Sequence, residues 1–160
     1  MHNFPAGFEL LVTGVRYADS YTMYTGAPES MAHLLEFLGS FQGPVVTFAG
    51  ARFDLPMLRA WSQQTLGAPL PSFQHYDLLV EIEQMVRHRI SLERLCYYTF
   101  GEKKVALGHH SQYGRIWETE PWRMIDYNRV DLDLTHELFM RVLRRQPLFL
   151  GDSTVVLPLP

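Results

Sequence analysis

The stretch TFAGARFDLPML, residues 47–58, predicts a strand that passes almost directly into a helix. It overlaps the apolar run VVTFA at residues 45–49, which is typical of a short buried strand. Beyond Asp54 the apolar residues recur at helical spacing, and Pro56 falls in the first turn, where proline is tolerated. Asp54 therefore has two interpretations: a helix cap, or a ligand-binding carboxylate at the open end of an α/β sheet.

Strand and helix patterns alternate on both sides of this stretch. Residues 9–17 and 21–25 carry β-branched and aromatic residues around a short turn, which predicts a hairpin. Residues 30–41 place apolar side chains at helical spacing. The later elements are expected to be an extended segment that turns into a helix at 75–86, a helix at 91–101, a long loop at 102–120 and a long helix at 121–145. This order predicts an α/β sandwich with a mixed sheet.

A single domain is expected over residues 1–160, with residues 145–160 as a C-terminal edge strand or tail. The hydrophobic content of 47% is typical of a globular protein with a proper core. The one cysteine excludes an internal disulfide and a Cys-rich zinc site. Because no apolar run approaches the ~20 residues of a membrane span, and MHNFPAGFEL lacks the features of a secretion signal, we expect a cytoplasmic protein without a membrane partner.

The overall charge does not by itself indicate a nucleic-acid-binding protein. The net charge is −3, whereas such proteins usually present a basic face. Local basic clusters at 86–89, 102–104 and 141–145 are interpreted as solvated surfaces. Motifs, rather than composition, must therefore indicate the function.

The segment IDYNRVDLDLTHEL in the last long helix combines an apolar stripe with carboxylates. Tyr127, Asp131 and Thr135 are spaced four apart and share one face, whereas Asp126 and Asp133 are expected to meet solvent. Asp131 is interpreted either as an ordinary surface aspartate or as a partly desolvated ligand at the boundary of the core. The stripe that is expected to face the core consists of Val130, Leu134, Leu138 and Val142.

Four segments of the chain, TFAGARFDLPML, YDLL, SLERLCYYTFGEKK and YNRVDLDLT, together resemble one known family. They resemble the proofreading-type 3′–5′ exonucleases of the ribonuclease H-like superfamily, in the tyrosine branch of the DEDD family. The stand-alone bacterial YprB-type domains are particularly similar. The resemblance extends over residues 8–145, which is most of the chain.

The resemblance implies a ribonuclease H-like mixed sheet flanked by helices, and a metal-dependent hydrolase that acts on single-stranded DNA or RNA ends. Asp54 matches the aspartate of the family's second motif, and Tyr127 and Asp131 match the tyrosine and aspartate of the third. In that family the carboxylates hold two Mg²⁺ or Mn²⁺ ions, and the tyrosine helps to position the attacking water. Asp54 and Asp131 are therefore the expected metal ligands, and all three residues the expected catalytic residues.

The chain departs from the family pattern at its opening strand. The first motif, Asp-x-Glu, is absent, so the sheet is expected to lack its first strand. Glu9 and Asp19 stand in the wrong places to replace it, and Asp77 is expected to anchor a loop by hydrogen bonds. Ala49 stands in the stretch where the family usually has an asparagine. We therefore expect a weak or inactive nuclease, and the unpaired sheet edge suggests a homodimer that repairs the sheet.

Three functions remain open from the sequence. The first is a metal-dependent 3′–5′ exonuclease, in which the chain is either a truncated form of a longer open reading frame or completes its site in some other way. The second is a degenerate relative that binds nucleic acid or a partner protein without cleaving anything. The third is a structural or regulatory domain in which Asp54 is a cap and Asp131 a surface residue.

Overall fold

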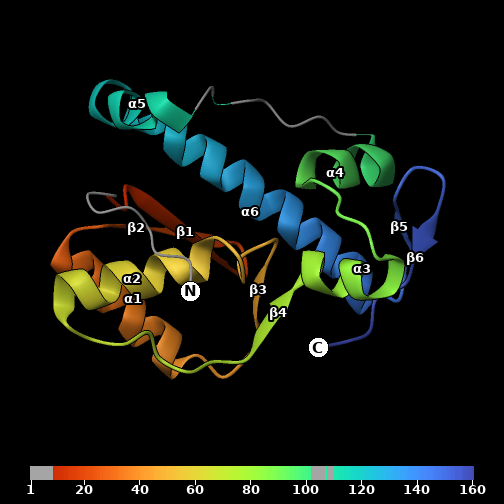
Figure 1. The fold of residues 1–160 in the computed structure, drawn as a ribbon, viewed down its shortest axis with the longest axis horizontal. Helices are drawn as coiled ribbons and strands as arrows, with labels where there is room; N and C mark the ends of the chain where they lie inside the picture. The colour runs from red at the N-terminus through yellow and green to blue at the C-terminus, as the bar shows by residue number, and fades with distance from the viewer. Residues whose placement is uncertain (1–8, 102–106, 108–109) are drawn as a thin grey trace.

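The computed structural model describes residues 9–101, 107 and 110–160, and in this part of the chain helices surround short strands (Figure 1). The elements, in chain order, are β1 (Val12–Tyr17), β2 (Ser20–Thr25), α1 (Pro28–Ser40), β3 (Val45–Thr47), α2 (Asp54–Leu66), β4 (His75–Asp77), α3 (Leu78–Val86), α4 (Leu92–Phe100), a 3₁₀ turn (His110–Gln112), α5 (Tyr113–Thr119), α6 (Pro121–Leu143), β5 (Leu148–Phe149) and β6 (Thr154–Val155). The mixed α/β class expected from the sequence is confirmed.

The single mixed sheet that we expected is not formed by the described residues. They form three two-stranded sheets instead: antiparallel β1–β2, parallel β3–β4 and antiparallel β5–β6. The run at 45–49 was expected to be an interior strand, yet within the described ranges β3 pairs only with β4. Strands must lie about 4.8 Å apart to share hydrogen bonds, and no described strand stands between β1 and β3. As far as the described residues extend, the sheet is therefore divided at this point.

The predicted hairpin is confirmed with a tight turn. Tyr17 pairs with Ser20 and Val12 with Thr25, so the two strands are in register over their whole length. Only Ala18 and Asp19 stand in the turn, and Ala18 has a φ of 52°, in the left-handed region that short hairpin turns need.

Helices cover both sides of the strands. The long helix α6 runs diagonally across the molecule and contacts both β1 and β3, while α1 packs against β2 and α2 (Figure 1). The contact of α6 with β1 is close at Gly14, where an added Cβ would lie 2.3 Å from Asn128 Oδ1 and 2.8 Å from Leu132 Cδ1. The divided sheet is thus held between α6 and the α1–α2 pair.

The apolar stripe of α6 is confirmed over three of its four positions. Leu134, Leu138 and Val142 are buried in the largest core cluster, which includes residues of α3, α4 and the C-terminal hairpin. Val130 is 44% exposed, so its expected place in the core is wrong. The elements that cover the later turns of α6 do not cover Val130. The helix also ends at Leu143, before the expected position 145.

Local end signals predicted α4 correctly. Ser91 accepts a hydrogen bond from the Arg94 N–H at 3.2 Å, and Gly101 ends the helix with a φ of 77°. The expected loop at 102–120 is wrong in its later half, because α5 lies there. Residues 102–106 and 108–109 of that loop lie outside the described residues. Ile116 of α5 packs with Leu107 and Met124. Tertiary burial therefore stabilises a helix that the sequence pattern does not predict.

Among the helices of residues 9–101, 107 and 110–160, none combines the length and apolar character needed to cross a membrane.

Candidate functional site

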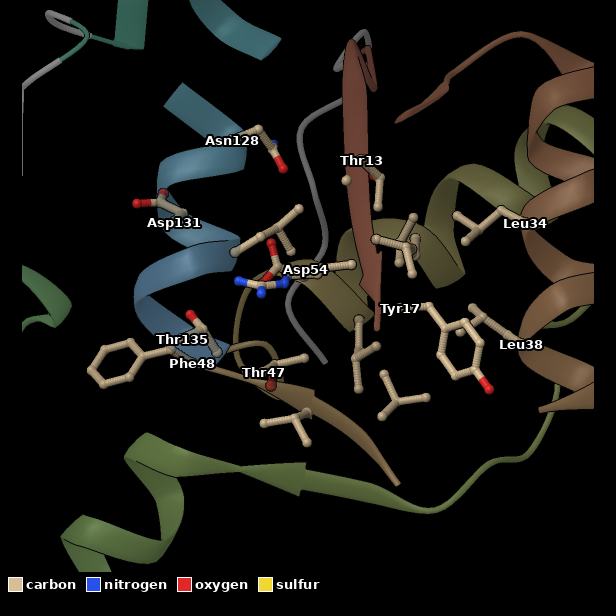
Figure 2. A pocket seen from close by; sticks show the side chains of 18 of the residues that line it. Thr13, Tyr17, Leu34, Leu38, Thr47, Phe48, Asp54, Asn128, Asp131 and Thr135 are labelled. Atoms are coloured by element: carbon tan, nitrogen blue, oxygen red, sulfur yellow. The ribbon is translucent and has the colours of Figure 1, made fainter. Parts of the chain in front are cut away.

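A pocket of about 450 Å³ opens between the two halves of the divided sheet (Figure 2). Its walls come from β1, β3, α1, the start of α2 and the middle of α6. In Figure 2, Asn128, Asp131 and Thr135 on α6 lie on one side and Leu34 and Leu38 on α1 lie on the other. The pocket therefore has one polar wall and one apolar wall.

Asp54 lies at this pocket but does not cap α2. It is the first residue of the helix, the N-cap residue is Phe53, and no side chain accepts a capping hydrogen bond there. The expectation that Asp54 caps the helix is therefore wrong. The turn before α2 is closed by the backbone instead, with the Leu55 N–H donating to the Gly50 carbonyl at 2.9 Å. The Asp54 carboxylate is thus available to the pocket, and near the helix N-terminus its charge is favoured by the helix dipole.

The surroundings of Asp54 raise the pKa of its carboxyl. The residue reaches solvent, yet the concave pocket displaces much of the water around the carboxylate, and this loss of hydration is the largest cause. The negative charges of Asp77 and then Asp131 raise the pKa further, while a hydrogen bond from its own backbone N–H lowers it. Two further carboxylates, on β4 and α6, therefore influence Asp54 electrostatically, and the negative charge here favours a cation nearby.

Asp77 anchors the turn before Asp54 through hydrogen bonds from backbone N–H groups, as expected from the sequence. This buried carboxylate accepts hydrogen bonds from the N–H groups of Ala49 at 2.9 Å and Ala51 at 2.8 Å, and from Leu79 and Val80 at the start of α3. Ala49 has a φ of 64°, a conformation that costs energy for a residue with a Cβ. Asp77 thereby stabilises the turn that carries the chain from β3 to Asp54.

Asp131 lines the same pocket as Asp54, and Tyr127 does not. Asn128, Asp131 and Thr135 of α6 all line the pocket. In the view of Figure 2, however, the Asp131 carboxylate is turned away from Asp54. Tyr127 is partly buried against the cluster of Ile116 and Met124. The structure therefore brings two of the three expected catalytic residues to one pocket and leaves the third beside α5.

Asp133 does not simply meet solvent, contrary to our expectation. Its Oδ1 accepts a hydrogen bond and ion pair from Arg16 Nη1 at 2.8 Å and a short hydrogen bond from the Tyr21 hydroxyl. The Arg129 guanidinium lies over the Tyr21 ring, with 4.6 Å between its central carbon and the ring centroid. This network attaches α6 to the hairpin. Asp126 is exposed, as expected.

The polar residues of the pocket that the sequence reasoning missed include Asn128, Arg16 and Thr47. Asn128 could have been found, because it precedes Asp131 by three residues and therefore shares its helix face. The sequence did not indicate Arg16 or Thr47 as pocket residues, because each lies within an ordinary strand pattern. Thr47 Oγ1 lies 2.8 Å from His75 Nε2 in a hydrogen bond, and burial lowers the pKa of His75.

The described residues do not by themselves fit a complete two-metal site. Mg²⁺ and Mn²⁺ prefer several hard oxygen ligands, and Asp54 and Asp131 supply two carboxylates. Asp77, the third carboxylate nearby, already accepts four backbone hydrogen bonds. In the described part of the chain, no group of three or more His, Cys, Asp or Glu side chains could hold a metal ion. Additional ligands would be needed.

Comparisons with known proteins add no assignment. No protein-family model matches the chain, and none of the curated proteins matches it either.

Proposed function

We propose that this chain is an exonuclease-type domain with a ribonuclease H-like fold, which binds or acts on the ends of single-stranded nucleic acid. Asp54 and Asp131 serve as its remaining metal ligands, for Mg²⁺ or Mn²⁺, and the absent Asp-x-Glu motif impairs catalysis. Tyr127 enters this proposal through the family resemblance alone. The observation that carries the proposal is that Asp54 and Asp131, far apart in sequence, line one pocket in which the charge of Asp131 raises the pKa of Asp54.

The electrostatics of the pocket support a cation as one occupant. Loss of hydration in the pocket and like charges both disfavour the ionised form of Asp54 in the protein alone. A bound divalent cation would reverse this effect, because it stabilises carboxylates in their charged form. A phosphate group, in contrast, would be repelled unless a cation came between it and the aspartates. Binding of a nucleic-acid end at this pocket should therefore depend on divalent cations.

The surface beside Asp54 supports a nucleic-acid strand as the ligand. Phe53 is 55% exposed, and an exposed aromatic ring is a surface on which an unpaired base can stack. Arg52 donates two hydrogen bonds to Glu83, and Arg89 lies 3.4 Å from the same carboxylate. The Asp77 carboxylate also interacts with Arg52 and Glu83, so the charges of this cluster are balanced, and the exposed Phe53 ring is the feature that supports a strand here.

A second function is favoured by the missing ligands. Because the described residues contain no three-carboxylate cluster, a domain that binds single strands or a partner protein without hydrolysing anything is the alternative. With two carboxylates in place of four, affinity for a second cation should fall steeply. No hydrolytic step can be assigned to the described residues alone.

The two functions can be separated with one labelled substrate. A single-stranded oligonucleotide, labelled at the 5′ end, would be incubated with the protein and Mn²⁺, beside Asp131→Asn and the matched control Asp126→Asn. The proposal predicts slow shortening from the 3′ end by the unmodified chain and the control, and none by Asp131→Asn. Retarded migration without shortening would favour the binding function. Equal shortening by all three proteins would rule out this site as the catalytic one.

A further inference from the structure

His136 of α6 lines the pocket together with Asp131 and Thr135, and the proposed function gives it no role. Its Nδ1 atom is buried and has no hydrogen bond in the described part of the chain. The Oε1 atom of Glu137, the next residue, lies 3.5 Å from this nitrogen, just beyond an ordinary hydrogen-bond length. The polar atom that His136 can present to the pocket is therefore the other ring nitrogen, Nε2.

The position of Glu137 determines which ring nitrogen carries the proton. A neutral imidazole has one N–H donor and one nitrogen that can only accept a hydrogen bond. An accepting Nδ1 would face a carboxylate oxygen, which is also an acceptor, at a buried position. A proton on Nδ1 makes this contact favourable instead, because a neighbouring carboxylate fixes the tautomer of a histidine. Nε2 is then a hydrogen-bond acceptor at the pocket.

An acceptor at this position selects a ligand that carries a hydrogen-bond donor. An ionised phosphate has no proton to donate, whereas the hydroxyl groups of a sugar can donate one. His136 follows Asp131 by five residues of α6, which places it roughly 7.5 Å farther along the helix axis. This separation is comparable with the extent of one nucleotide. The sugar of a nucleotide whose phosphate lies near Asp131 could therefore reach His136.

We propose that Nε2 of His136 accepts a hydrogen bond from a sugar hydroxyl of the terminal nucleotide, and that Glu137 is the positioning residue that keeps the proton on Nδ1. This inference rests on the proposed function, because it requires a strand end in the pocket with its last phosphate near Asp54 and Asp131. A contact of this kind distinguishes strands by their terminal sugar. His136 is thus a specificity-determining residue on the same helix as Asp131.

The role of Glu137 can be tested without nucleic acid. Long-range proton–nitrogen NMR correlations of the imidazole ring identify the nitrogen that carries the proton, at about pH 8.5, where free imidazole side chains are neutral. We expect the proton on Nδ1 in the unmodified chain and in the control Glu118→Ala, which changes an exposed residue of α5. In Glu137→Ala a large share of the proton should move to Nε2. A proton on Nε2 in the unmodified chain, or the same tautomer in all three proteins, would overturn the positioning role.

The contact with the strand can be tested with four oligonucleotides that differ only in their terminal sugar. They carry both hydroxyls, only the 2′ hydroxyl, only the 3′ hydroxyl, or neither, and a 5′ fluorescein reports binding by anisotropy in the presence of Mn²⁺. Loss of one of the two hydroxyls should weaken binding to the unmodified chain about three- to tenfold, as expected for one hydrogen bond. His136→Leu should bind all four strands equally.

Two further variants keep this test independent of the folding of His136→Leu. The side-chain oxygen of His136→Gln can replace Nε2 as the acceptor, so this variant should retain part of the hydroxyl preference. Glu137→Ala should reduce the preference, because its ring no longer holds the proton on Nδ1. These results would not follow from a purely structural role of His136.

Two outcomes would overturn this inference and leave the proposed function standing. The first is an equal hydroxyl preference in the unmodified chain and in His136→Leu, because another residue would then recognise the sugar. The second is binding of all four strands with equal affinity by the unmodified chain. Failure of every strand to bind would instead overturn the proposed function and this inference together.

Discussion

Asp131 on α6 and Asp54 at the start of α2 line one pocket, and the negative charge of Asp131 raises the pKa of the Asp54 carboxyl. Strand β3 leads through a tight turn to Asp54, and the helix that carries Asp131 crosses both parts of the divided sheet. The two carboxylates are therefore positioned by separate elements that the fold brings together. An electrostatic interaction of this kind can be measured without any ligand.

Removing the charge of Asp131 should lower the pKa of Asp54. In Asp131→Asn the repulsion that disfavours ionised Asp54 is lost, while the loss of hydration and the charge of Asp77 remain. The pKa of Asp54 should fall but stay above its ordinary value, as followed by NMR titration of the side-chain carboxyl carbon. Asp126→Asn, on an exposed face of the same helix, should leave the pKa unchanged. An unchanged titration of Asp54 in Asp131→Asn would mean that the two groups do not interact.

The raised pKa of Asp54 also determines how stability depends on pH. Because the folded protein binds this proton more tightly than the unfolded chain, the stabilisation is complete below the ordinary pKa of aspartate. It is lost as the pH rises through the raised pKa of the folded state. Asp54→Asn should therefore be more stable than the unmodified protein at neutral pH, and the gain should shrink toward pH 3. Urea unfolding at several pH values measures this difference; a variant less stable at neutral pH would contradict it.

Loss of the Asp77 carboxylate should destabilise the turn before α2. Asp77→Ala removes the acceptor for four backbone N–H groups and leaves several of them unsatisfied in a buried place. The expected loss is about 3–5 kcal/mol of the free energy of unfolding, measured by denaturant titration. Asp77→Asn keeps one acceptor oxygen and should lose less. A loss below about 1 kcal/mol for Asp77→Ala would show that these bonds are not maintained in solution.

Substitution of alanine at two glycine positions should change the free energy of unfolding in opposite directions. A Cβ at Gly26 would lie 2.1 Å from the Leu10 carbonyl oxygen, a backbone atom that cannot move aside cheaply. Gly26→Ala should therefore cost about 1–3 kcal/mol. A Cβ at Gly114 in α5 meets nothing within 4 Å, so Gly114→Ala should stabilise by up to about 1 kcal/mol through helix propensity. Thermal unfolding of the two variants measures whether each substitution lowers or raises the melting temperature. An equal change in melting temperature for both variants would contradict the close approach at Gly26.

Elements with strong local signals were predictable from the sequence. The hairpin follows from two β-rich runs around a short turn, and α4 follows from Ser91 and Gly101 at its ends. The role of Asp77 as an anchor was also predicted, because an aspartate just before a helix tends to accept backbone hydrogen bonds. In each case the decisive interactions connect residues near in sequence, or follow from the residue type.

The errors concern interactions between distant segments. Asp133 was expected in solvent because nothing in its helix indicates Arg16 or Tyr21 as partners. Asp54 was expected to be a cap because aspartate is common there, but backbone bonds already close the turn. The helix α5 depends on packing around Ile116 rather than on its own pattern. The sequence predicted a missing first strand but not the division of the sheet. Whether β1 and β3 belong to one sheet depends on whether a strand lies between them.

The most direct test of the central claim is a Mn²⁺ titration followed by NMR. If Asp54 and Asp131 share a cation site, the amide signals of Leu55 and Leu132 should broaden together at low Mn²⁺ concentration, before signals near the exposed Asp152. Asp54→Asn should abolish both effects at once, and EDTA should restore the signals. Broadening near only one of the two aspartates, or an equal response at all acidic residues, would contradict a shared site.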